Sequence, residues 1–99
     1  MRIVLTDYAK INLAKIYGYL AKYTSIENAK NVKNGVLEQI STLLKYAKLG
    51  QIEEDLYELD KNHRRLVYKH YKIVYRIEKD TIYITDIFDS RQDPEKIKP

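Results

Sequence analysis

The side chains best suited to chemistry lie in the middle of the sequence, where cations and tyrosines alternate. The cations are Lys61, Arg64, Arg65, Lys69, Lys72, Arg76 and Lys79, and only Glu78 opposes them. Tyr68, Tyr71 and Tyr75 are interleaved with them. Cations neutralise phosphates and tyrosine rings stack on bases. This basic block therefore predicts a surface for nucleic acid or another acidic partner. The alternative is an exposed sheet face whose charge serves only solubility.

Two histidines, His63 and His70, flank the basic strand of this block. A neutral imidazole at either position could act as a general base. The interpretation that we favour makes each an exposed residue of a hairpin turn. Neither has a partner at the spacing of a metal ligand, and the chain has no cysteine. We therefore predict no metal, no disulfide and no cofactor.

Acidic runs border the basic block, at residues 53–60 before it and 80–95 after it. Such runs are usually solvated faces, and we predict that here. The whole chain carries a net charge of +4 and ten tyrosines beside one phenylalanine. A pI near 9.2 favours acidic partners. Tyrosine suits a thin core or a contact surface, because its ring is buried while its hydroxyl stays in water.

Two helices are predicted ahead of the basic block, after a first strand at Arg2–Thr6. The first should run from about Asp7 to about Tyr23, capped by Thr6 or Asp7. Its apolar stripe is Ala9, Leu13, Ile16, Tyr17 and Leu20. The second should begin after Ser25 and reach about Ala47, with Gly50 as its stop. Its predicted buried face is Ala29, Val32, Val36, Ile40, Leu43 and Leu44, with Leu37 on the flank. Gly35 indicates close packing against the first helix.

The second half changes to the period of β-strands. β-branched and aromatic residues predict strands at 56–59, 65–68, 71–77 and 81–88. The short polar links at 60–63, 69–70 and 78–80 predict hairpins. The fold class is therefore α+β, with a helical hairpin on one face of a mainly antiparallel sheet. Its 99 residues form a single domain, 1–99. The start of the chain is too short in apolar residues for a signal peptide, so we expect a cytoplasmic protein without a membrane span.

The order of these segments resembles the RelE/ParE toxins of type II toxin–antitoxin systems over nearly the whole chain. Residues 9–20 are similar to the family's A-x-x-D-L-x-x-I-x-x-Y-I pattern, and Ser25…Ala29 to the S-x-x-x-A of ParE-type members. Leu44…Gly50 resembles the L-x-x-x-P-x-x-G exit, with Ala47 in place of proline. Residues 71–77 resemble the Y-R-x-x-Y-x-[IV] strand, and residues 87–94 the final strand with its R-x-x-P tail.

The resemblance implies a microbial-ribonuclease-like fold, a growth-arresting toxin of a plasmid-stabilisation type and a cognate antitoxin as partner in a hetero-oligomer. ParE-type members poison DNA gyrase, whereas RelE-type members cut mRNA in the ribosome. The helix patterns favour ParE. If the chain were a RelE-type endoribonuclease, the resemblance would make Lys72, Arg65 and Arg91 catalytic. RelE-type members usually carry a tyrosine or histidine shortly after the arginine that corresponds to Arg91, and here residues 92–97 contain neither.

In the gyrase interpretation no catalytic residue is needed, and the target- or nucleic-acid-binding residues would be Arg64, Tyr71, Lys72, Arg76 and Arg91. Arg91 has a further alternative, a plain ion pair with a neighbouring acid. A third function outside toxicity is a harmless basic binding module. We predict that the antitoxin binds an exposed apolar strip near the helical hairpin, and that Leu13, Tyr17 and Leu20 pack mostly in the core.

Overall fold

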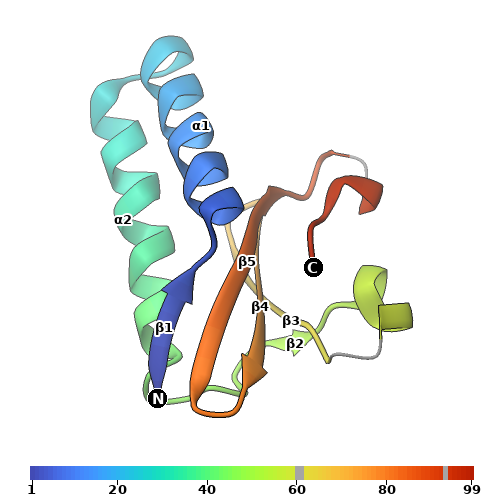
Figure 1. The fold of residues 1–99 in the computed structure, drawn as a ribbon. Coiled ribbons are helices and arrows are strands. Elements are labelled where there is room, and N and C mark those ends of the chain that lie inside the picture. The colour runs from blue at the N-terminus through green and yellow to red at the C-terminus, as the bar shows by residue number, and fades with distance from the viewer. Residues whose placement is uncertain (60–61, 93) are drawn as a thin grey trace.

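A computed structural model describes residues 1–59, 62–92 and 94–99. Strand β1 is followed by a helical hairpin and then by the remaining strands, with short 3-10 helices (η) on either side of the last three (Figure 1). The elements are β1 Arg2–Leu5, α1 Asp7–Tyr23, α2 Ile26–Thr42, β2 Gln51–Ile52, η1 Glu54–Leu59, β3 Arg64–Tyr68, β4 Tyr71–Glu78, β5 Thr81–Asp89 and η2 Pro94–Lys96. Asp60, Lys61 and Asp93 of the predicted charged runs and of the link at 60–63 lie outside the described residues.

The five-stranded sheet has the order β1-β5-β4-β3-β2. Strand β1 runs parallel to β5, and every other neighbouring pair is antiparallel, which confirms the mainly antiparallel α+β fold. The hairpins at Lys69–His70 and around Lys79 are also confirmed, and both lysines adopt positive φ. The first and last strands are therefore neighbours, and the chain returns beside its start.

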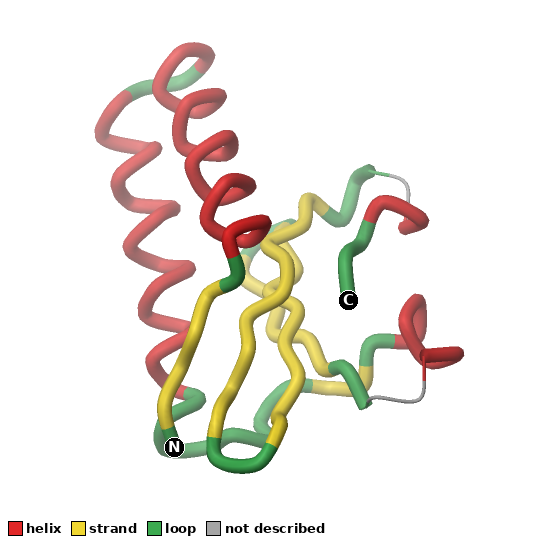
Figure 2. The backbone as a smooth tube through the Cα atoms, viewed as in Figure 1, coloured by secondary structure: helices red, strands yellow, loops and turns green. Residues whose placement is uncertain are grey.

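The helical hairpin covers one side of the sheet, while η1 and the C-terminal segment lie on the other side (Figure 2). The larger core lies under the hairpin and joins Ala9, Leu13 and Leu20 of α1 to the isoleucines of β4 and β5. The smaller core, on the opposite face, consists of Leu56, Val74, Phe88 and Ile97. A chain of this size thus buries apolar side chains on both faces of its sheet.

Both helices begin where the sequence predicts. The hydroxyl oxygen of Thr6 accepts the Ala9 N–H at 3.1 Å, and that of Ser25 accepts the Asn28 N–H at 3.0 Å. Each bond satisfies an amide that the first helical turn leaves without a partner. The predicted end of α2 was wrong: the helix ends at Thr42 and Leu44 is exposed. There Leu43 N–H bonds to the Ile40 carbonyl, so the chain tightens into turns.

Two further predictions were wrong. Residues 56–59 do not form a strand: they belong to the 3-10 helix η1, and Leu56 packs in the smaller core. Gly35 was predicted to allow close packing against α1, but it lies against β3 instead. A Cβ at Gly35 would lie 2.1 Å from the ring of Tyr68, so the missing side chain lets β3 approach α2.

Asp86 joins three parts of the chain that are far apart in sequence. It is fully buried on β5, where its carboxylate accepts the Asn12 side-chain N–H at 2.8 Å and the Lys98 backbone N–H at 3.0 Å. Burial raises the pKa of Asp86, although these hydrogen bonds oppose the rise. The carboxylate therefore ties α1 and the C-terminal segment to the sheet.

Candidate functional site

The basic block does not form one continuous cationic surface. In the β3–β4 register Arg65 lies opposite Val74, and Lys72 lies opposite Val67. Side chains that are opposite one another in an antiparallel pair, or two residues apart on a strand, share a face. Arg65 and Lys72 therefore share the face of Val74, which packs in the smaller core away from the helical hairpin.

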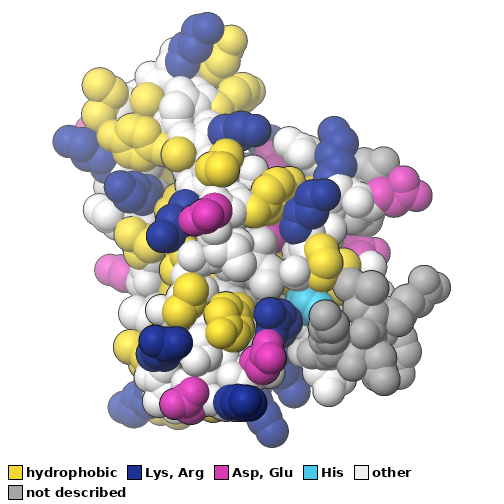
Figure 3. All heavy atoms as spheres, in the orientation of Figure 1, with side chains coloured by type: hydrophobic (Ala, Val, Ile, Leu, Met, Phe, Trp, Pro, Cys, Tyr) yellow, Lys and Arg dark blue, Asp and Glu magenta, His cyan; other side chains and the backbone are white. Residues whose placement is uncertain are grey.

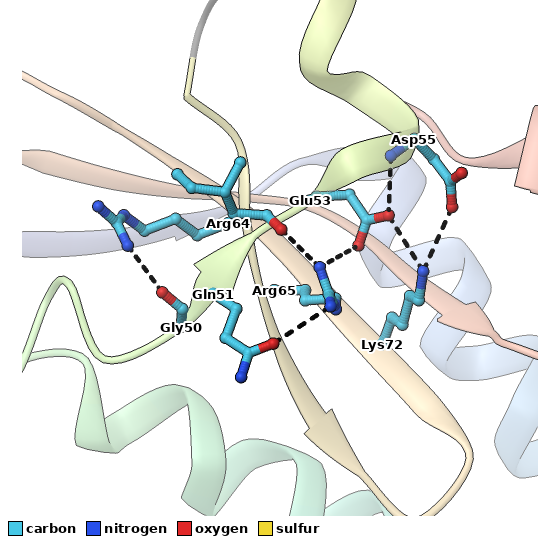
Figure 4. Close-up of polar contacts among 8 residues, drawn as sticks. Gly50, Gln51, Glu53, Asp55, Arg64, Arg65 and Lys72 are labelled. Carbon is cyan, nitrogen blue, oxygen red and sulfur yellow. Dashed lines mark hydrogen bonds and ion pairs between the residues drawn. The ribbon is translucent and has the colours of Figure 1, made fainter.

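A buried carboxylate lies between these two cations (Figure 4). Glu53 has an exposed side-chain fraction of 1%, whereas those of Arg65 and Lys72 are 20%. Its Oε1 accepts Lys72 Nζ at 3.0 Å and its Oε2 lies 3.6 Å from an Arg65 guanidinium nitrogen. Asp55 adds a second carboxylate, with its Oδ2 3.3 Å from Lys72 Nζ. The two cations are therefore neutralised by two acids of the same chain.

The short strand β2 positions Glu53. Gln51 pairs with Arg65 and Ile52 with Arg64, and the Glu53 N–H donates to the His63 carbonyl at 2.7 Å. The Arg65 guanidinium also donates to the Ile52 carbonyl at 2.5 Å. Sequence patterns missed this carboxylate, because an acid inside an acidic run is normally solvated. The available signal was the acidic run placed directly before basic strands that could pair with it.

His63 is buried, with 2% of its surface exposed, so the prediction of an exposed turn residue was wrong. Its backbone extends the pairing of β2 with β3 by one residue, through its carbonyl. His63 is therefore part of the folded interior and is not accessible to a substrate as it stands.

Arg64 is separated from Arg65 and Lys72 because consecutive strand residues point to opposite faces. Its guanidinium donates to the Gly50 carbonyl at 2.8 Å, and the Gly50 N–H donates to the Tyr75 hydroxyl at 2.9 Å. Burial raises the pKa of the Tyr75 hydroxyl. A Cβ at Gly50 would lie 2.6 Å from the Arg65 carbonyl oxygen, which explains the glycine. Arg64 thus anchors the loop before β2.

A second group forms at the end of β5, where Tyr71 pairs with Asp89. Arg91 binds both carboxylate oxygens of Asp89, with Nε–Oδ1 at 3.0 Å and a terminal guanidinium nitrogen–Oδ2 at 2.8 Å. This bond holds the pKa of Asp89 below its usual value. His70 Nε2 lies 3.8 Å from the same carboxylate, in the predicted turn. Arg91 is therefore in the ion pair that its acidic neighbours indicated.

The outer parts of this group differ in accessibility. The Arg91 side chain is 65% exposed, so it projects into solvent despite its pair with Asp89. Tyr71 is buried, and burial raises the pKa of its hydroxyl. On the other half of β4, Arg76 pairs with Glu78 and lies with its guanidinium carbon 4.7 Å from the centre of the Tyr83 ring. Arg91 is thus the candidate cation that a macromolecule reaches most directly.

The six candidate residues are therefore not one site. Only Arg65 with Lys72, and Tyr71 with Arg91, come together through shared carboxylates. Phosphodiester cleavage requires a cation free to hold the phosphate and a group that takes a proton. The charges of Arg65 and Lys72 are already engaged by Glu53, although each side chain keeps 20% of its surface exposed. Within residues 1–59, 62–92 and 94–99, no three side chains of the metal-binding types gather into a possible metal site.

No helix in the described part of the chain has the length and apolar character needed to span a bilayer. A family model described as the ParE toxin of the type II toxin–antitoxin system parDE matches residues 3–94. No curated protein matches the sequence. Among solved structures, a chain of a chromosomal ParDE toxin–antitoxin system from P. aeruginosa has the same fold. It superposes with a TM-score of 0.74 and 22% identity, covering 88% of this chain and 92% of the other.

Proposed function

The chain belongs to the ParE toxin family of type II toxin–antitoxin systems, and on this premise we propose that it arrests bacterial growth by poisoning DNA gyrase. Such a toxin acts in the cytoplasm, where gyrase and its DNA are. The observation that carries the proposal is the position of Glu53 between Arg65 and Lys72. Poisoning requires a gripping surface and no catalytic group, so it is compatible with cations that are already neutralised.

Messenger-RNA cleavage fits this arrangement poorly. The two strand cations that would hold the phosphate are bound by Glu53 and Asp55. Of the two histidines considered as bases, His63 is buried, and His70 has its Nε2 3.8 Å from Asp89, the carboxylate that also binds Arg91. Arg91 is engaged by Asp89, and the residue after it is Gln92, whose amide does not ionise near neutral pH and so cannot act as a general base. Among these groups only His70 remains to accept the proton of a 2′-hydroxyl, and Arg91, which shares Asp89 with it, is already paired.

We further propose that the gyrase-contacting surface includes Arg91, and that Arg76 and Lys72 contribute less because each is already paired with an acid. Arg91 projects from the end of β5, and its charge is only partly offset by Asp89 because it is largely exposed. Tyr71 and Arg64 would act indirectly, since Tyr71 is buried and Arg64 holds the Gly50 carbonyl. Substitution of each residue tests its role.

The toxin's partner in this proposal is a cognate antitoxin, which forms a hetero-oligomer with it and neutralises it. A chain with a net charge of +4 is complementary to an acidic antitoxin segment. Co-expression with the antitoxin should raise the yield of soluble toxin. A chain that is equally soluble and harmless alone would contradict this part of the proposal.

Two measurements test the target. In a bacterial host, DNA synthesis should fall within minutes of induction, before translation, and the DNA-damage response should follow. With purified gyrase, plasmid DNA and ATP, the toxin should increase the fraction of gyrase-cleaved DNA. The Arg91→Ala variant should weaken both effects, whereas Lys79→Ala, which removes an exposed cation at the opposite hairpin, should not.

The opposite order of events would refute the proposal. If methionine incorporation falls first and ribosome-bound mRNA is cut, the chain is a ribosome-dependent endoribonuclease. If the folded, antitoxin-free protein changes neither synthesis rate nor gyrase cleavage, it is a binding module without toxicity. Circular dichroism of each variant must show the wild-type fold before either conclusion is drawn.

A further inference from the structure

A cavity opens at the end of β5, between the second half of α1 and the chain that follows β5. Its volume is about 410 Å³, and the side chains in its lining that can bind a ligand are Lys15, Tyr19, Tyr71, Asp89, Arg91 and Gln92. Tyr71 is buried, whereas 59% of Tyr19 and 65% of the Arg91 side chain are exposed. The cavity is therefore closed toward the sheet and open between two accessible residues from distant parts of the chain.

Tyr19 presents to this cavity an aromatic ring that the fold leaves largely in solvent. Its ring centre lies 4.8 Å from that of Tyr23, one helical turn later on α1, and the two planes are tilted by 41°. Ring pairs at this separation attract each other, so Tyr23 limits the orientations of Tyr19. A ring that is already oriented loses little entropy when a flat ligand stacks on it. Tyr19 therefore suits a nucleobase, because every base has a flat π-face.

Two cations beside the Tyr19 ring can hold a phosphate. Lys15 is exposed and lies one helical turn before Tyr19 on the same side of α1. Arg91 binds Asp89 through its Nε and one terminal nitrogen. A guanidinium has five N–H donors, so the edge that carries the two terminal nitrogens still has donors for a phosphate. Asp89 thus orients the arginine without using all of its donors.

The remaining groups favour a nucleotide over an acidic peptide. The Gln92 amide donates and accepts hydrogen bonds, as the edge of a nucleobase does. Asp89 places a carboxylate in the same lining, beside which a neutral base is tolerated better than the carboxylate of a peptide. The anionic part of the ligand then belongs at the exposed mouth, next to Lys15 and Arg91. A cavity of about 410 Å³ lies within the size range of small-ligand sites.

The same side of α1 continues this arrangement toward the start of the helix. Its residues are spaced by four, three and four positions, as neighbours on one helix face are: Tyr8, Asn12, Lys15 and Tyr19. An adjoining cavity of about 550 Å³ shares Lys15 with the first and includes Tyr8. There Lys98 Nζ lies 5.7 Å from the centre of the Tyr8 ring. A second aromatic ring with a cation therefore follows the first along one groove.

The surface outside the cavities has a similar composition. Hydrophobic and cationic side chains lie next to one another over the hairpin on the face that Figure 3 shows. Tyr8 and Tyr19 are eleven residues apart, which corresponds to about 16 Å along a helix. A short single strand of nucleic acid can therefore contact both rings, with its phosphates beside the lysines of the groove.

We propose that the cavity at the end of β5 binds an unpaired nucleotide of DNA, with its base stacked on Tyr19 and its phosphate held by Lys15 and Arg91. The inference rests on the proposed function, because a toxin that traps gyrase on cleaved DNA acts beside opened strands. It gives the toxin a contact with the DNA itself, in addition to a contact with the enzyme. The adjoining cavity, with Tyr8 and Lys98, receives the next part of the strand.

Binding of a short, fluorescently labelled oligothymidylate to the toxin alone tests the stacking contact without gyrase. The toxin is produced with its antitoxin, separated by denaturation and refolded, and circular dichroism confirms the fold of each variant. Tyr19→Ala should weaken binding by at least about fivefold, whereas Tyr19→Phe keeps the ring and should stay within about twofold of the wild type. Tyr46→Ala is the matched control, since Tyr46 is 57% exposed, has Lys45 beside its ring and lies outside both cavities.

The salt dependence of the same binding tests the phosphate contacts. On a single strand each phosphate contact adds about 0.7 to the slope of log affinity against log salt concentration. Lys15→Gln and Arg91→Gln should each reduce the slope by about this amount. Lys48→Gln, at an exposed lysine outside both cavities, should leave it unchanged. A residue that only supported the fold would not alter this slope.

The outcomes separate the nucleotide site from the proposed function. If the folded wild type does not bind the oligothymidylate, or if Tyr19→Ala binds it like Tyr46→Ala, the cavity is not a nucleotide site and Arg91 contacts protein. If an oligouridylate of equal length binds more tightly than the oligothymidylate, the assignment to DNA is overturned. If the predicted binding pattern is found but gyrase cleavage is unaffected, the gyrase proposal fails while the nucleotide site stands.

Discussion

Replacing Glu53 by glutamine should destabilise the fold, although the two side chains have nearly the same shape. The substitution removes the charge that Lys72 Nζ meets at 3.0 Å and that Arg65 meets at 3.6 Å. Removing one partner of a buried ion pair costs about 3–5 kcal/mol when the remaining charge is fully enclosed. Here the two cations keep 20% of their surface in solvent, and Lys72 keeps Asp55. We therefore expect a smaller loss of about 2 kcal/mol in the free energy of unfolding.

Urea unfolding followed by circular dichroism measures this loss. For a domain of this size it corresponds to a fall of about 10 °C in Tm. Glu54→Gln is the matched control, because Glu54 is exposed and next in sequence, and it should change stability by less than about 0.5 kcal/mol. Lys72→Met should cost about 3 kcal/mol, since it leaves the more deeply buried Glu53 with a weaker partner.

A double-mutant cycle then isolates the interaction. Glu53→Gln combined with Lys72→Met leaves no uncompensated charge from this pair, so the double variant should be at least about 1 kcal/mol more stable than the sum of the single losses predicts. If Glu53→Gln matches Glu54→Gln, or if the two losses simply add, then Glu53 is solvated in solution. The argument against mRNA cleavage would fail with it, because Arg65 and Lys72 would be free for phosphate.

Three further predictions concern the helices and the buried carboxylate. Gly18→Ala should stabilise the protein by about 0.5–1 kcal/mol in urea unfolding, because a Cβ there meets nothing within 4 Å and alanine favours helix; no gain would indicate strain in α1. Gly35→Ala should instead lower the free energy of unfolding by about 1–3 kcal/mol, because its Cβ overlaps the Tyr68 ring. In a Tyr68→Ala background the same substitution should cost less, because the clashing ring is absent. Burial raises the pKa of Asp86, so the folded state binds its proton more tightly than the unfolded chain does. Its contribution is then greatest below the unfolded carboxyl pKa of about 3.9 and declines as pH rises through the folded pKa. The stability of the wild type relative to Asp86→Asn should therefore fall between acidic and neutral pH, and a constant or rising difference would contradict the sign.

The local part of this fold was predictable because its causes lie close together in the sequence. Thr6 and Ser25 cap helices by bonding to amides three residues away, and the apolar stripe of α1 repeats at helical spacing. The hairpin strands around 69–70 and 79 follow from β-branched runs separated by short links. The order of these segments was sufficient to identify the toxin family, and the family model over residues 3–94 confirms it.

The candidate site was only partly predictable. The cations of the basic block were found, but their grouping into separate pairs was not, because it depends on strand register and on which face each residue takes. Arg91 and its acidic neighbour are two residues apart, so their ion pair could be foreseen. The neutralisation of Lys72 by Glu53 could not, since 19 residues separate them.

Tertiary structure alone decided the remaining features, and the physical reason is the same for each. Glu53 and His63 are polar residues in polar stretches, yet pairing of β2 with β3 buries both. Gly35 faces Tyr68 because α2 packs on β3, a contact that a helical pattern does not contain. Sequence by itself determined the first strand, the starts of both helices, the three strands between residues 64 and 89, the net charge and the family, whereas β2 and η1 were not predicted. The burial of charged groups, and hence which cations remain free for a partner, came from contacts between residues far apart in the chain.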